Sequence, residues 1–340
     1  MINFSKKAEE TISKYLSLWQ TNKLAIGVIF SDGTRDFYTS ENANTETVFD
    51  IGSISKTFTA ALILKLISEG KISLDDKADN YIDLPKGVYP KVSQLLTHTA
   101  GYGHLTPLEI TLPALLKKKY QKANPYRYAN EETVIKCLSR RKRCKEHYHY
   151  SYSDFPYAIL AVIASRVTGK PFAEILENFI KNELELKSTH IARRSAREIS
   201  YFKGKAVPSW DWELSNPYIS GGGIVSNIVD MTEYAALQLK EIHSFIKTSH
   251  KLWENSFEKH GNVGSCLGWH TYKNSNQLWH VGGVGTYRTS MIFNVKKGIS
   301  IIVMGNSKGK KSANVHYLAK LLYSDIKRNK LKAQNQENTP

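Results

Sequence analysis

The sequence has 340 residues, enough for a sizeable buried core and for about two domains of roughly 150 residues each. With 41% hydrophobic and 23% charged residues, its composition excludes a disordered chain, a collagen and a coiled coil. Lysine and arginine number 47 against 31 acidic residues, which gives a formal net charge of +16. Since no recognisable nucleic-acid-binding module accompanies the basic segments 117–119 and 140–145, we expect no nucleic-acid partner.

Neither membrane crossing nor export is expected from the sequence. The longest apolar runs, 60–67 and 158–164, fall short of the roughly 18 to 20 residues needed to cross a bilayer. The N-terminal segment carries charges where a secretory signal needs an apolar stretch, so we expect a cytoplasmic protein, or an exported one if a leader was removed. Cys137, Cys144 and Cys266 are too few and too dispersed for a disulfide framework or a metal site, and are expected to be free thiols.

Hydrophobic periodicity predicts strands near both chain ends and mainly helices between them. In chain order, the predicted elements are a helix at 4–20, a hairpin of strands at 24–30 and 36–38, helices at 53–69, 92–96, 112–120, 131–137, 155–167 and 172–184, strands at 278–279, 286–293 and 299–304, and a helix at 313–326. Because the N-terminal hairpin needs sheet partners, both chain ends are expected to build one domain around an inserted helical one. We place the discontinuous α/β domain at 1–60 and 205–330, the mostly helical domain at 61–204 and a flexible tail at 331–340.

A serine and a lysine stand three residues apart at the start of the first buried helix. Ser53 and Lys56 lie one turn apart on one helix face, so the amine can reach the hydroxyl. A serine hydroxyl is a poor nucleophile until a base takes its proton, and lysine serves only if burial or nearby positive charge lowers its pKa. Ser55 points elsewhere around the helix. Taken alone, this spacing occurs by chance in most chains of this length, which leaves a purely structural role open.

Two later segments strengthen the catalytic interpretation. Residues 150–154 (YSYSD) precede an apolar helix that ends near Gly169, and residues 279–283 (WHVGG) lie on a predicted strand. A serine-lysine pair, then a serine-aspartate-asparagine type element, then a lysine-threonine-glycine type strand is the pattern of β-lactamases and penicillin-binding proteins. Counterparts of all three occur here in that order.

With these elements, the sequence resembles the serine β-lactamase and D-alanyl-D-alanine peptidase superfamily, in particular its class C and esterase-like branch. The resemblance covers nearly the whole chain and includes the segments 65–76, 94–101, 152–169 and 221–231. It implies an α+β fold of the β-lactamase and transpeptidase type, with an antiparallel sheet flanked by helices and a mostly helical inserted domain. It also implies a serine hydrolase that needs no cofactor.

The resemblance assigns roles to individual residues. It implies that Ser53 is acylated, that Lys56 activates it and that Tyr152 shares the proton transfers. Tyr150 is a rival for the last role, and we favour Tyr152 because its distance to the following helix matches the family. The backbone N–H groups of Ser53 and Gly283 would form the oxyanion hole, which stabilises the negative charge developing in acyl transfer.

Two positions depart from the family pattern. Asp154 stands where asparagine is usual, and an ionised carboxylate can only accept hydrogen bonds. It is expected either to contact the substrate or to pair with Lys56, where it would raise the pKa of the lysine and weaken it as a base. Val281 lacks the hydroxyl of the family's threonine or serine, which weakens carboxylate recognition and argues against a dedicated carboxypeptidase.

Further residues are expected around the substrate. Gly282, like its neighbour Gly283, lets a substrate lie close to the strand, with a bulge or turn as the alternative. His280 is expected to donate a hydrogen bond toward Tyr152 or the substrate, with a purely structural histidine at the end of a strand as the alternative. His98 is interpreted as structural. The basic segment 140–145 either guides an anionic substrate or is a solvated loop.

The remaining motifs do not suggest another chemistry. The glycine-lysine segment 305–310 is one residue short of the phosphate-loop spacing. No nucleophile elbow frames a serine, and no histidine pair on a helix suggests zinc. We therefore expect neither a cofactor nor a metal.

The sequence thus predicts a serine hydrolase that forms an acyl-enzyme through Ser53. Its expected substrate is a small molecule or short peptide: a peptide or D-amino-acid amide, an ester or a β-lactam-like compound. One alternative is an acyltransferase or transesterase of a biosynthetic pathway. A catalytically silent ligand-binding relative is the other alternative, which Asp154 and Val281 keep open.

Overall fold

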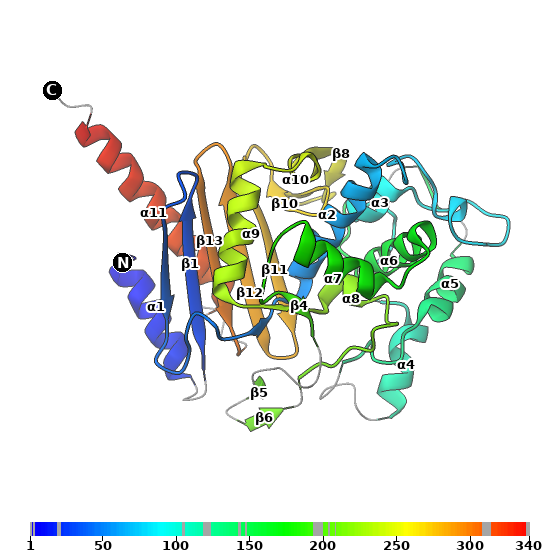
Figure 1. Ribbon diagram of the computed structural model, residues 1–340, viewed down its shortest axis with the longest axis horizontal. Coiled ribbons are helices and arrows are strands. Elements are labelled where there is room, and N and C mark those ends of the chain that lie inside the picture. Colours follow the sequence, from blue (N-terminus) through cyan, green and yellow to red (C-terminus); the bar gives the residue numbers. More distant parts are fainter. Residues whose placement is uncertain are drawn as a thin grey trace.

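Figure 1 shows strands gathered on one side of the molecule and most of the shorter helices on the other. This computed structural model describes residues 2, 4–18, 22–103, 106–117, 124–141, 144–146, 148–192, 200–202, 205–207, 209–307 and 314–337. In these ranges, no helix is both long enough and apolar enough to cross a bilayer.

The strands from the two chain ends form one antiparallel sheet. They are β1 (Leu24–Phe30), β2 (Arg35–Thr39), β8 (Leu252–Phe257), β9 (Val263–Cys266), β10 (His270–Tyr272), β11 (Leu278–Val284), β12 (Tyr287–Asn294) and β13 (Ile299–Gly305). Their order is β2-β1-β13-β12-β11-β10-β9-β8. The predicted hairpin is confirmed as β1 and β2, and β1 finds its other partner in β13, with Leu24 opposite Gly305.

Helices cover both faces of this sheet. α1 (Lys6–Ser17) and α11 (Val315–Glu337) lie on one face, and α9 (Ile228–Lys240) lies on the other (Figure 1). Alternate side chains of β13 serve the two layers: Ile301 and Val303 pack with α1 and α11, while Ile302 and Met304 join the core that includes α9. The expected α+β class, an antiparallel sheet flanked by helices, is therefore confirmed.

The second part of the molecule is mainly helical and surrounds α2. Its elements are η1 (Gly52–Ile54), α2 (Ser55–Ser68), η2 (Ala78–Asn80), α3 (Val92–Leu96), α4 (Leu108–Leu116), α5 (Glu131–Ser139), α6 (Phe155–Thr168), α7 (Phe172–Asn182), α8 (Ile219–Gly222), α10 (Ser244–Ser249) and the short strands β3 (Phe49–Asp50), β4 (His190–Ile191), β5 (Ser200–Phe202), β6 (Lys205–Val207) and β7 (Ile224–Ser226). Most residues of α2 and α6 are buried, and Gly169 ends α6 in the left-handed conformation.

Several elements differ from the prediction. α4 begins directly after Pro107, four residues before the predicted helix at 112–120, and α11 continues to Glu337 through much of the predicted tail at 331–340. Strands β8 to β10 were not predicted, because β9 and β10 have only four and three residues and β8 contains Glu254 and Asn255, which are uncommon in strands. All three cysteines are free. The domain boundaries stay a prediction.

We predict that Phe58→Ala destabilises the protein strongly. The Phe58 side chain of α2 is fully buried and stacks on Tyr234 of α9, with ring centroids 4.0 Å apart, so it joins the helical part to the helix that covers the sheet. Its loss should lower the free energy of unfolding, measured in urea, by about 3–5 kcal/mol. The exposed Leu252→Ala serves as control and should change this energy by less than about 0.5 kcal/mol. Equal effects of the two substitutions would contradict this packing.

Candidate active site

η1 and β11 meet backbone to backbone beside the start of α2. A Cβ atom on Gly282 would clash with the carbonyl oxygen of Ile51, and one on Gly52 would clash with the backbone nitrogen of Gly283. Gly52 also has a φ of +54°, which disfavours a side chain. The chain needs glycine at both positions, and their contact brings the backbone of Ser53 close to that of Gly283.

A cavity of about 740 Å³ opens at this contact. Its lining comes from η1, the segment before α6, strands β10 to β12 and the start of α11: Ser53, Tyr150, Tyr152, His270, Trp279, His280, Val281, Gly282, Gly283, Arg288, Thr289, Asn314, Val315 and His316. Of the expected site residues, Ser53, Tyr152, His280, Gly282 and Gly283 therefore line one cavity. Lys56 and Asp154 lie behind Ser53 instead.

Lys56 is fully buried and has three polar partners. Its Nζ lies 3.3 Å from Ser53 Oγ, 2.6 Å from Asp154 Oδ1 and 2.9 Å from the carbonyl oxygen of Gly221. An ammonium group can donate to all three oxygens. A neutral amine can donate to Asp154 and Gly221 and accept the Ser53 hydroxyl proton with its lone pair. The same geometry thus suits both protonation states of a base.

Burial lowers the pKa of Lys56, and the carboxylate of Asp154 opposes this shift only in part. Asp154 does raise the pKa of Lys56, as expected, but desolvation of the fully buried ammonium has the larger effect, so the net pKa is lowered. The other carboxylate oxygen of Asp154 accepts a hydrogen bond from the hydroxyl of Tyr126, at 2.7 Å. Asp154 thus pairs with Lys56, one of the two roles expected for it, and it is not among the residues that line the cavity.

Tyr152 lies closer to the serine-lysine pair than Tyr150 does. The Tyr152 hydroxyl forms a hydrogen bond with Ser53, and Lys56 Nζ lies 5.0 Å from the centre of its ring. The Tyr150 hydroxyl instead contacts Nδ1 of His270 at 3.2 Å. Burial and, second, the Asp154 charge hold the pKa of Tyr152 well above its ordinary value, so its phenol is neutral and can donate a proton.

His280 presents an acceptor rather than the expected donor. Its Nδ1 lies 2.9 Å from the carbonyl oxygen of Val281, so this nitrogen carries the proton and Nε2 carries a lone pair. Burial, with the charges of His270 and Lys56, holds the pKa of His280 well below its ordinary value and keeps the ring neutral. Its ring stacks on His270 with centroids 4.5 Å apart. Nε2 is buried and has no hydrogen-bond partner in the described ranges.

His98 packs behind Tyr152, in keeping with the structural role expected for it. Its ring centre lies 4.6 Å from that of Tyr152, and its Nδ1 accepts a hydrogen bond from the backbone N–H of Ser153 at 3.3 Å. Of the basic segment 140–145, Arg140 and Arg141 pair with Glu109 of α4, and residues 142–143 lie outside the described ranges.

The motifs did not identify four residues of the site. Gly221 had a signal, since three successive glycines often mark a close approach, and a Cβ atom there would lie 3.3 Å from Lys56 Nζ. Tyr126, His270 and Arg288 had no local signal, because folding brings each from a separate segment of the chain.

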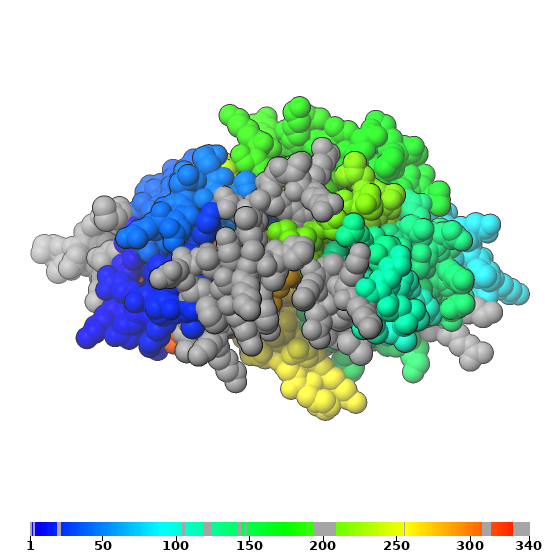
Figure 2. Space-filling view, turned by 90° about the horizontal axis from the view of Figure 1, so that it is seen from below, coloured from blue at the N-terminus to red at the C-terminus, as the bar shows by residue number. Residues whose placement is uncertain are grey.

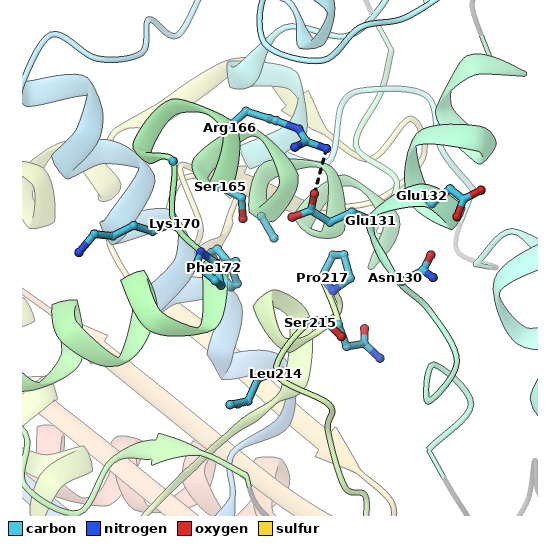
Figure 3. A pocket seen from close by; sticks show the side chains of 14 residues that line it. Asn130, Glu131, Glu132, Ser165, Arg166, Lys170, Phe172, Leu214, Ser215 and Pro217 are labelled. Atoms are coloured by element: carbon cyan, nitrogen blue, oxygen red, sulfur yellow. Dashed lines mark ion pairs between the residues drawn. The ribbon is translucent and has the colours of Figure 1, made fainter.

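A second cavity of about 570 Å³ lies in the helical part and contains none of the expected site residues. Figure 3 shows Arg166 paired with Glu131 across its rim, where the nitrogen and oxygen are 3.1 Å apart. Asn216 in its wall donates to the carbonyl oxygen of Tyr126, which links this wall to the Asp154 network. No group of three metal-ligating side chains occurs within the part of the chain that the structure describes.

Comparison with known proteins identifies the family. A sequence model of the β-lactamase family matches residues 10–324, so the chain belongs to the β-lactamase family. The fold of this family carries serine-hydrolase chemistry in general. Two solved structures share the fold. A class C β-lactamase from Rhodobacter sphaeroides has a TM-score of 0.76 and 18% identity, and the match covers 95% of this chain and 99% of that one. An octameric penicillin-binding protein homologue from Pyrococcus abyssi has a TM-score of 0.74 and 22% identity, and the match covers 94% of this chain and 76% of that one.

Curated relatives are longer than this chain. Protein flp of Staphylococcus aureus is 22% identical over 309 residues, which covers 85% of this chain and 58% of that protein. A β-lactamase of Providencia stuartii is 25% identical over 235 residues, covering 68% and 56%. The chain thus spans little more than half the length of either relative.

We predict that Gly282→Ala lowers kcat for ester hydrolysis, whereas Gly103→Ala does not. A Cβ atom at position 282 would push β11 away from the carbonyl of Ile51 and displace the N–H of Gly283, whereas position 103 has open space. Loss of one oxyanion donor should reduce kcat for a chromogenic ester by about 100-fold or more. Unchanged kcat in Gly282→Ala would show that the backbone contact has no catalytic consequence.

We also predict that Asp154→Asn moves the acid limb of the kcat/KM pH profile to lower pH. Lys56 must be neutral to accept a proton, and removing the carboxylate removes the interaction that opposes its lowered pKa. The neutral amine then persists at lower pH, and the limb should move by about one pH unit or more. Asp75→Asn, at a largely exposed carboxylate, should leave the profile unchanged. A shift to higher pH would contradict the assignment of Lys56 as the base.

Proposed function

We propose that this protein is a serine hydrolase that forms an acyl-enzyme through Ser53 and acts on a small ester or amide. The observation that carries the proposal is the position of Ser53, whose Oγ lies 3.3 Å from the amine of a buried lysine and which lines a cavity together with Tyr152 and Gly283. Nucleophile, base, proton donor and a candidate oxyanion donor thus converge on one space where a carbonyl group can sit.

Acylation uses Lys56 as the base and Tyr152 as the acid. Ser53 Oγ attacks the carbonyl carbon while its proton passes to the neutral amine of Lys56. The backbone N–H groups of Ser53 and Gly283 stabilise the oxyanion. The tetrahedral intermediate collapses, and the leaving group takes the phenolic proton of Tyr152. Because the pKa of Tyr152 is raised, the phenolate is short-lived and relies on the ammonium of Lys56, 5.0 Å from the ring.

Deacylation reverses these transfers. The phenolate of Tyr152 takes a proton from water, whose oxygen attacks the acyl carbon. As the ester bond breaks, Ser53 Oγ recovers its proton from the ammonium of Lys56. The acid product leaves with all three residues restored. If an alcohol or amine occupies the position of the water, the same steps give acyl transfer, which remains the alternative reaction.

The cavity sets the class of substrate. Its volume of about 740 Å³ and its lining by Trp279 and Tyr150 suit a compact acyl group. Val281 supplies no hydroxyl for a substrate carboxylate. Arg288 partly compensates, because its guanidinium is held against Gly283 by hydrogen bonds to the carbonyl oxygens of Gly285 and Tyr287, at 3.1 and 2.5 Å. Small esters, D-amino-acid amides and β-lactams are therefore the substrates to test.

We predict that fluorescent penicillin or a fluorophosphonate labels the wild-type protein covalently and does not label Ser53→Ala. Intact-mass spectrometry after incubation with D-amino-acid amides, esters and β-lactams should show an acyl adduct whose mass reports the acyl group. Failure of every probe to label the wild type would instead favour a catalytically silent, ligand-binding member of the family.

The two tyrosines provide a matched pair of variants. Tyr152→Phe should reduce kcat/KM for ester hydrolysis by about 100-fold or more, because it removes the proton donor. Tyr150→Phe loses a contact with His270 and should retain most of the activity. The reverse pattern would transfer the acid role to Tyr150.

A further inference from the structure

α4 exposes an unusual number of leucine side chains. Ile110 and Ala114 face the interior with 1% of their surface exposed. The opposite side carries four leucines at helical spacing. Their exposed fractions are 61% for Leu108, 36% for Leu112, 48% for Leu115 and 72% for Leu116. They make up half of the large apolar residues found exposed in the described ranges, and they share one helix of nine residues. We call this surface the leucine face.

The surroundings of the leucine face are basic. Lys117 follows the last leucine and is exposed, and Lys118 and Lys119 continue the run in the sequence. Glu109 is the acidic residue of α4, and it pairs with both Arg140 and Arg141 of the adjoining segment, at 3.2 and 3.7 Å. The positive charges around the helix therefore exceed the negative ones.

α4 lies at the edge of the molecule and near the catalytic residues. Figure 1 shows it at the rim of the helical part, and in Figure 2 the teal atoms of the segment around α4 reach the surface. Thr106, two residues before the helix, contacts the hydroxyl of Tyr126 at 3.5 Å. Tyr126 in turn binds Asp154 of the catalytic network.

We propose that the leucine face docks the protein on an anionic lipid surface. A helix whose exposed side carries leucines, with an exposed lysine at its end, can insert these apolar side chains at the boundary of headgroups and acyl chains while the lysine contacts negative headgroups. Such an attachment lies along the membrane surface and needs no spanning helix. The inference does not depend on the acyl chemistry proposed above.

Charge favours a lipid surface over a second copy of this chain. A chain with a net charge of +16 that paired through the leucine face would bring two basic rims together. An anionic bilayer offers the opposite charge and an apolar layer in the same place.

The test is co-sedimentation of the full chain with vesicles of phosphatidylcholine alone and of phosphatidylcholine mixed with phosphatidylglycerol. We expect binding to the anionic vesicles that weakens as salt is raised. Leu108→Ser/Leu116→Ser should reduce the bound fraction by about tenfold or more, and Lys117→Glu should reduce it as well. Leu252→Ser, at a leucine 52% exposed on β8, should bind like the wild type.

The other outcomes overturn the inference. One is that the wild type does not bind the anionic vesicles. Another is that the double leucine variant binds as well as the wild type, and a third is that Leu252→Ser loses as much binding as the double leucine variant. The inference would also be overturned if light scattering showed that the wild type is a dimer, that the leucine substitutions dissociate it, and that neither form binds vesicles. The leucine face would then contact a second copy of the chain. The melting temperature of each variant and its rate of hydrolysis of a water-soluble ester report folding, so that a lost fold is not taken for lost docking.

Discussion

The site depends on the contacts that the buried amine of Lys56 makes with three oxygen atoms. Burial favours its neutral form, and an oxygen from each of three segments fixes its position: Ser53 of η1, Asp154 before α6 and Gly221 of α8. These segments meet because α2 and α6 are buried along most of their length. The packing of the helical part therefore sets both the position of the proposed base and its readiness to accept a proton.

The sheet supplies the other half of the site. β11 is held between β10 and β12, and its glycines allow it to approach η1 more closely than any side chain would permit. A serine at the start of a buried helix and an N–H group on a strand thus meet across the boundary between the helical part and the sheet. Neither part of the molecule contains the site alone.

The sequence predicted the local features of the site well and its electrostatics only in part. Ser53 and Lys56 are three residues apart on one turn, so their contact follows from helix geometry, and the apolar helix after Tyr152 was visible in the pattern. The direction in which Asp154 shifts the pKa of Lys56 was predicted correctly, but the sequence does not show the depth of burial, whose opposite effect is larger. Tyr126 lies 28 residues from Asp154 along the chain, with no motif to join them.

The protonation of Lys56 can be measured directly. Heteronuclear NMR of the lysine side-chain amines, with the Lys56 signal assigned by comparison with Lys56→Arg, gives its titration in the resting protein. We expect the pKa of Lys56 to lie below that of the exposed lysines in the same spectra. A Lys56 amine that titrates with those lysines or above them would mean that the ion pair with Asp154 outweighs burial, and that Ser53 has no lysine base at neutral pH.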